Sequence, residues 1–141
     1  MGSRVEVSRD KENYGAAWFV GTVLKVIGKS YFLVEYESLR IDNDGSSGVP
    51  LKEIVDLQYI RPSPPPASKF DGLFDVLEEL EAFHKGGWVA GVVMELRCDS
   101  KYLVKSKHHE EEIEVDRTTI RPRFDWINDH WVRISRVSNN F

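Results

Sequence analysis

The chain has 141 residues, of which 41% are hydrophobic and 30% charged, and its formal net charge is -4. This composition is typical of a folded globular protein, and the length suits one ordinary domain or two very small ones. The acidic balance argues against wholesale neutralisation of a nucleic-acid backbone and favours basic partners, of which a Lys- and Arg-rich peptide is the simplest. The single cysteine, Cys98, excludes an internal disulfide and is typical of a reducing compartment, cytosol or nucleus. No apolar run approaches the roughly 18 residues of a membrane span, so no membrane partner is expected.

The first half of the chain predicts a short strand and then a long β-hairpin. Residues 4–8 alternate as a strand, and the stretch from Tyr14 to Tyr36 reads as two antiparallel strands joined by a turn at 28–30. Tyr14 and Trp18 lie on the way into this hairpin and Tyr36 lies on the way out. Because antiparallel strands pair position by position away from the turn, we expect the three rings to meet at the open end.

Four segments recur in the same order in the second half of the chain, which predicts two copies of one unit of about 60 residues. The matched segments are 5–7 with 80–82, 18–23 with 88–93, 31–34 with 102–104, and 55–62 with 115–122. The match of Tyr31 to Tyr102 is slightly displaced, and it places Lys107 at the position of Tyr36.

Each unit consists of short strands separated by Gly and Asp turns, which predicts an all-β fold of two small, curved β-barrels packed side by side. The first barrel is expected at 4–62, a Pro-rich linker at 63–69, and the second barrel with a C-terminal tail at 70–136. Residues 75–85 have a helical composition, but the repeat requires a strand there, and we favour the strand. The apolar residues at 124–127, with Trp131, are expected to pack back on the second unit or on the interface.

The duplicated segments resemble the plant Agenet domain, a Tudor-like small β-barrel, in its tandem arrangement. The residues that carry the likeness cover 4–136: Val5-Glu6-Val7, Trp18-Phe19, Val34-Glu35-Tyr36, Val55-Asp56 and Ile60-Arg61-Pro62, then Ala82-Phe83-His84, Gly87-Trp88, Gly91-Val92-Val93, Ile120-Arg121-Pro122, Asp125-Trp126 and Trp131. The resemblance implies paired barrels without catalytic activity or cofactor. Characterised tandem members look like nuclear chromatin readers that hold methylated lysine on histone tails, some of them marking heterochromatin. Related Tudor-like pairs bind RNA-associated or other partner proteins, so the resemblance leaves the ligand open.

The candidate ligand site is an aromatic cage in the first unit, formed by Tyr14, Trp18 and Tyr36 with a carboxylate from Asp44. A methylated ammonium has lost hydrogen-bond donors but kept its charge, so aromatic faces compensate for the lost water through cation–π attraction. A carboxylate can accept the remaining N–H of a dimethyl form. Each ring has an alternative role in packing at the barrel rim, and Trp18 in particular recurs as Trp88. The second unit is expected to lack the cage because a cation at Lys107 would repel a methylammonium.

Acidic residues are candidates for contacts with the basic peptide. In the first unit Asp42 could also supply the cage carboxylate, and Asp56 recurs as Asp116 and could instead cap the following turn. In the second unit the acidic run at 110–116 reads either as a solvated strand that prevents edge pairing or as an anionic wall for Lys and Arg side chains. The residues proposed for the peptide are Asp42, Glu53, Asp56, Glu110, Glu112 and Glu114.

Two other functions compete with the reader. One is a protein-interaction scaffold that is indifferent to methylation, for example one that docks other chromatin proteins. The other is nucleic-acid binding through a one-sided basic face, formed by Lys101, Lys105, Lys107, Arg117, Arg121 and Arg123. The pair His108-His109 has no third ligand at useful spacing, so no metal is expected. No nucleophile elbow, phosphate loop or paired-carboxylate motif is found, so we do not expect an enzyme.

Overall fold

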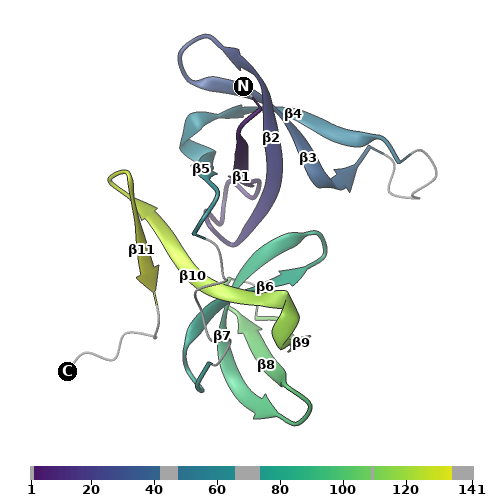
Figure 1. Ribbon diagram of the computed structural model, residues 1–141, viewed down its shortest axis with the longest axis vertical. Helices are drawn as coiled ribbons and strands as arrows, with labels where there is room; N and C mark the ends of the chain where they lie inside the picture. The colour runs from purple at the N-terminus through teal and green to yellow at the C-terminus, as the bar shows by residue number, and fades with distance from the viewer. Residues whose placement is uncertain (1, 42–47, 66–73, 109, 135–141) are drawn as a thin grey trace. The chain divides into compact units, whose positions relative to one another are not determined.

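The computed structural model describes residues 2–41, 48–65, 74–108 and 110–134. The described residues form β-strands joined by turns and by short 3-10 helices, which confirms the predicted all-β fold (Figure 1). No helix among the described residues is long and apolar enough to cross a membrane.

The chain divides into two compact units, one containing residues up to 63 and the other containing the later residues, apart from 85–87. The linker predicted at 63–69 is described only as far as 65. The loop at 42–47, which contains Asp42 and Asp44, lies outside the described residues.

The first unit is an antiparallel sheet in the order β5-β1-β2-β3-β4. Its elements are β1 (Arg4–Ser8), β2 (Ala17–Ile27), β3 (Tyr31–Arg40), β4 (Pro50–Asp56), the 3-10 helix η1 (Leu57–Tyr59) and β5 (Ile60–Pro62). The predicted hairpin is confirmed, because β2 and β3 pair from Ile27 opposite Tyr31 and are joined by the turn at 28–30. Gly28 in this turn has a positive φ of 64°, a conformation that glycine adopts without strain.

The second unit repeats this plan in the order β10-β6-β7-β8-β9, with β11 added beside β10. Its elements are β6 (Glu79–His84), β7 (Gly87–Arg97), β8 (Lys101–Ser106), β9 (Glu112–Asp116), the 3-10 helix η3 (Arg117–Thr119), β10 (Ile120–Ile127) and β11 (His130–Ile134). The strand β6 confirms the preference for a strand over a helix at 75–85. The apolar tail is a hairpin, because β10 runs on past β6 and pairs with β11 (Figure 1).

The strand register corrects one detail of the sequence comparison. Gly21 on β2 faces Tyr36, and its counterpart Gly91 on β7 faces Ser106. Ser106, and not Lys107, therefore occupies the position of Tyr36. The comparison was displaced by one residue because it aligned two tyrosines, whereas the register aligns Tyr31 with Lys101.

In each hairpin, a glycine lies where the two strands approach too closely for a side chain. A Cβ added to Gly21 would lie 2.5 Å from a Val34 methyl group and 2.9 Å from the carbonyl oxygen of Glu35. At Gly91 the corresponding contacts are 2.5 Å to Val104 and 3.0 Å to the carbonyl of Lys105. Each unit encloses its own small apolar core beside this contact. The buried residues of the first core are Val5, Val7, Val23, Val34, Tyr36 and Val55, and those of the second are Phe74, Leu80, Ala82, Val93, Tyr102, Val104, Val115 and Ile120.

Candidate functional site

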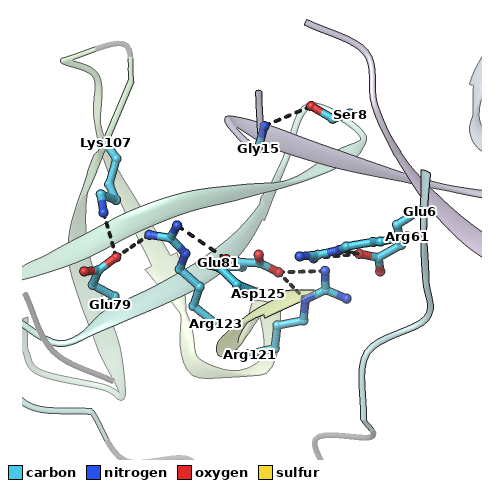
Figure 2. Close-up of polar contacts among 10 residues, drawn as sticks. All are labelled: Glu6, Ser8, Gly15, Arg61, Glu79, Glu81, Lys107, Arg121, Arg123 and Asp125. Atoms are coloured by element: carbon cyan, nitrogen blue, oxygen red, sulfur yellow. Dashed lines mark hydrogen bonds and ion pairs between the residues drawn. The ribbon is translucent and has the colours of Figure 1, made fainter. Parts of the chain in front are cut away.

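Trp18, one of the predicted cage residues, lies against a buried ion pair. The guanidinium of Arg61 on β5 donates hydrogen bonds of 3.2 and 2.9 Å to one carboxylate oxygen of Glu6 on β1 (Figure 2). The same guanidinium lies 4.0 Å from the centroid of the Trp18 ring. Arg61 and Glu6 are each 2% exposed and Trp18 is 4% exposed. The cation over this ring is therefore supplied by the protein itself.

The second unit contains the same three residues in the same relationship. Arg121 on β10 donates to Glu81 on β6 over 2.7 Å, and its guanidinium lies 4.2 Å from the ring of Trp88 (Figure 2). The recurrence of Trp18 as Trp88 thus follows from a shared structural element. Breaking a buried pair leaves one charge uncompensated, which explains why tryptophan, carboxylate and arginine recur together.

Tyr14 is the exposed member of a ring cluster in the first unit. Its side chain is 55% exposed, its ring meets Trp18 edge-on at 5.5 Å between centroids, and it lies 6.4 Å from Tyr59. The β1–β2 loop that carries it is fixed at its base, where the Gly15 amide donates to the Ser8 hydroxyl over 2.9 Å (Figure 2). Asp10 stabilises the middle of the loop by accepting from the amides of residues 12 and 13.

Tyr36 belongs to a second, separate cluster that contains a cation. Its hydroxyl donates a 2.8 Å hydrogen bond to Glu53 on β4, and Arg9 makes a bidentate pair with the same carboxylate at 3.1 and 2.7 Å. The Arg9 guanidinium lies 5.4 Å from the centroid of Tyr36 and 5.8 Å from that of Phe19. Two aromatic rings and one carboxylate therefore surround a positive charge here, which is the arrangement that recognises organic cations.

The electrostatics of this cluster are mutually reinforcing. The hydrogen bond from Arg9 lowers the pKa of Glu53, and the tyrosine hydroxyl adds to this effect against the opposing effect of burial. Burial raises the pKa of Tyr36, and its hydrogen bond to the carboxylate raises it further. The pKa of Arg9 is raised by its bond to Glu53. At neutral pH the cluster therefore holds an ionised carboxylate between a neutral phenol and a guanidinium.

A pocket of about 300 Å³ opens beside this cluster, between the end of β1 and the strand β4. In the lining of this pocket, the Lys11 ammonium lies 5.4 Å from the centroid of the Tyr59 ring. A second cation of the protein therefore contacts a second aromatic ring. The pocket is lined by Val7, Ser8, Arg9, Lys11, Glu53, Ile54, Val55, Asp56 and Tyr59.

The second unit replaces the polar members of the cluster. The register places His84 at the position of Arg9, Ile113 at that of Glu53 and Ser106 at that of Tyr36. Lys107 points its ammonium at Glu79 over 2.8 Å. The two units thus share the buried Trp–Arg–Glu element but differ at the cation cluster.

The structure places the predicted acidic residues in different settings. Glu53 and Asp56 line the pocket of the first unit, and Asp56 also caps η1 through the Gln58 amide at 3.1 Å. Glu110, Glu112 and Glu114 belong to the second unit, where Glu110 pairs with Lys105 and Glu114 with Arg97. Alternation along β9 exposes Glu112 and Glu114 and turns Val115 inward.

Arg9, Phe19 and Tyr59 were missed by the sequence analysis. Arg9 follows β1 directly, and Tyr59 follows the Asp56 cap, but only the register shows that these positions face the same pocket. A carboxylate three residues before the end of β4 was a usable signal, because its counterpart in the second unit is the apolar Ile113.

Four of the six basic residues considered for nucleic-acid binding are engaged with carboxylates. Lys105 pairs with Glu110, and Arg121 pairs with the buried Glu81. Lys107 and Arg123 both contact Glu79 (Figure 2). These four cations are locally neutralised, so this part of the second unit is not a continuous basic face.

These features define a small all-β module with an aromatic and acidic cluster in its first unit. The chain belongs to the Agenet domain family: the Agenet domain model matches residues 2–65. The chain is 35% identical to the crystal structure of AGD34 from Arabidopsis thaliana AGDP1, with a TM-score of 0.80 over 93% of this chain and 86% of that one. It is 34% identical to the crystal structure of the ADCP1 tandem Agenet domain 3-4, with a TM-score of 0.79 over 93% and 84% of the two chains.

The same likeness extends to a full-length relative. The chain is 35% identical over 130 residues to Protein AGENET DOMAIN (AGD)-CONTAINING P1 from Arabidopsis thaliana. This match covers 92% of the chain but only 24% of that protein. The chain therefore corresponds to about a quarter of the length of this relative.

Proposed function

We propose that the chain is a tandem pair of Agenet domains that acts in the nucleus as a chromatin reader. Its first unit binds a histone tail through a methylated lysine. The proposal rests on the site occupied by the Arg9 guanidinium, which we call the cation seat. There a positive charge lies against Phe19 and Tyr36 and is paired with Glu53.

A methylated ammonium suits this seat for a physical reason. Methylation spreads the charge over carbon atoms and removes N–H donors, so aromatic faces replace lost hydration at a gain of roughly 0.5–1 kcal/mol per exposed contact. Glu53 can accept the one N–H that a dimethyl-lysine retains, which favours the dimethyl form. The ligand enters through the 300 Å³ pocket, whose second carboxylate is Asp56.

The predicted cage residues take unequal parts in this proposal. Tyr36 forms a wall of the seat, and Tyr14 contacts Tyr59, which lines the pocket. The Trp18 ring packs edge-on against Tyr14 and stabilises the Arg61 guanidinium. Glu53 supplies a carboxylate of the seat, whereas Asp44, from which one was expected, lies outside the described residues. The acidic residues Glu110, Glu112 and Glu114 meet further Lys and Arg side chains of the tail.

The test is calorimetric titration with a basic histone-tail peptide in unmodified and dimethyl-lysine forms. The dimethyl form should bind more tightly, and Tyr36→Ala should abolish the difference. Because Tyr36 is in the core, Glu53→Gln provides a second variant that keeps the side-chain shape. The matched control is Ser106→Ala, which changes the equivalent position of the second unit and should leave the difference intact.

Equal affinities for the two peptides in the unaltered chain would contradict the reader and favour a scaffold that ignores methylation. Binding to RNA that falls steeply with added salt would instead favour a nucleic-acid partner.

A further inference from the structure

Arg9 covers the aromatic wall that a ligand cation would have to reach. The residue Tyr36 is 1% exposed, whereas the side chains of Arg9 and Glu53 are 34% and 35% exposed. The guanidinium lies over the Tyr36 ring and holds both oxygens of Glu53. Every group of the seat is therefore already engaged by a residue of the chain itself.

We infer that Arg9 is a specificity-determining internal competitor: it occupies the cation seat of the first unit and must leave before a ligand cation can enter. The inference rests on the proposed function, and it adds an exchange step to it. A ligand gains the two ring faces and Glu53 only by replacing a bidentate pair and two cation–π contacts. Cations that interact weakly with aromatic faces, such as an unmodified lysine ammonium, are thereby excluded.

The local structure allows the exchange without unfolding. The loop that follows Arg9 is held by its backbone and by short side chains, through the Ser8–Gly15 hydrogen bond and the Asp10 contacts. None of these bonds involves the Arg9 guanidinium, so the side chain can rotate toward solvent while the loop stays in place. The half-exposed pair that it leaves is of the kind that contributes little stability.

The second unit lacks both the seat and this device. Its counterpart of Arg9 is His84, and Ile113 and Ser106 stand in place of the carboxylate and the phenol. The competitor and the groups that it covers are therefore present together in one unit and replaced together in the other, as expected if they form one functional set.

The experiment compares Arg9→Ala with the unaltered chain in titrations with the dimethyl-lysine and unmodified histone-tail peptides. The dimethyl-lysine peptide should bind Arg9→Ala about fivefold to tenfold more tightly, because the cost of displacing one ion pair and two ring contacts is removed. Arg4→Ala is the matched control: it removes the same charge and an exposed pair with Glu37, and it should change affinity by less than about twofold. In the double variant Arg9→Ala/Glu53→Gln the gain should disappear.

The outcomes separate this inference from the proposed function. If the unaltered chain distinguishes the two peptides but Arg9→Ala binds no more tightly, Arg9 is not a competitor and the reader stands. If Arg9→Ala binds both peptides more tightly and equally, the competitor stands and methyl-lysine reading does not. If neither chain binds either peptide, both are overturned. Should Arg9→Ala lower the melting temperature, Arg9→Gln, which keeps the aliphatic stem without the charge, is measured in the same way.

Discussion

The guanidinium of Arg61 lies 4.0 Å from the Trp18 ring centroid, and that of Arg121 lies 4.2 Å from the Trp88 ring centroid. The two units thus repeat one stacked pair to within a few tenths of an ångström. A feature that recurs where the ligand cluster does not is part of the scaffold. The recurrence indicates a structural role for Trp18 and Trp88.

Removing the arginine of the stacked pair should strongly lower the stability of the first unit. Arg61→Ala leaves Glu6, 2% exposed, without its compensating charge, and we expect a loss of about 3–5 kcal/mol in unfolding free energy. Chemical denaturation measures it. Arg4→Ala, which breaks an exposed pair, should cost under about 1 kcal/mol. Equal effects of the two changes would show that the buried pair is not structural.

Substitutions of Tyr14 and Trp18 should have different effects on binding and on stability. Tyr14→Ala removes a ring that is 55% exposed, so it should weaken peptide binding and leave the melting temperature nearly unchanged. Trp18→Ala opens a cavity under Arg61 and should cost about 3–5 kcal/mol of stability. Thermal melting and peptide titration of both variants test this prediction. It is contradicted if Trp18→Ala keeps the stability of the unaltered chain and loses only peptide binding.

A methyl group at either close strand contact should be poorly tolerated. Gly21→Ala would place a Cβ 2.9 Å from a backbone oxygen, and Gly91→Ala would place one at 3.0 Å, so the strands themselves must shift. We expect each to cost about 1–3 kcal/mol. Unchanged denaturation midpoints in both variants would refute the packing argument.

Acid should release the Arg9–Glu53 pair. The fold holds the pKa of Glu53 below its ordinary value of 4.5, so the ionised carboxylate stabilises the native state. That contribution is fully present above about pH 4.5 and is lost as the pH falls through the lower folded value. The difference in melting temperature between the unaltered chain and Glu53→Gln should therefore shrink from pH 7 toward pH 3. Glu35→Gln, which loses a 4.0 Å contact with Lys52, is the control. A difference that persists at low pH would contradict the assignment.

The strands and the repeat could be predicted because their signals are local. Alternating residues and a glycine turn predicted the hairpin at 14–36, which the structure places at 17–40, and the repeat predicted the strand within 75–85, which lies at 79–84. The carboxylate Glu53 was also named from the sequence, as a peptide contact. These signals depend on residues that are close in the sequence, so one sequence was sufficient to predict these elements.

The composition of the cation cluster could not be predicted, because it depends on pairing between distant strands. Arg9 and Glu53 are far apart in sequence and meet only once β1 and β4 are placed across the core. The displaced match of Tyr31 to Tyr102 had a related cause. Two tyrosines look equivalent in a sequence, whereas a bulge shared by β2 and β7 determines which residues share a face.

The repeated stacked pair also makes the second unit a ready-made host for engineering. Since the backbone around it already follows the same register, the substitutions His84→Arg, Val89→Phe, Ser106→Tyr and Ile113→Glu would graft the cation seat onto β6, β7, β8 and β9. Each of the two arginines could then be removed separately, which would measure how far each one limits the access of a cation to the seat of its own unit.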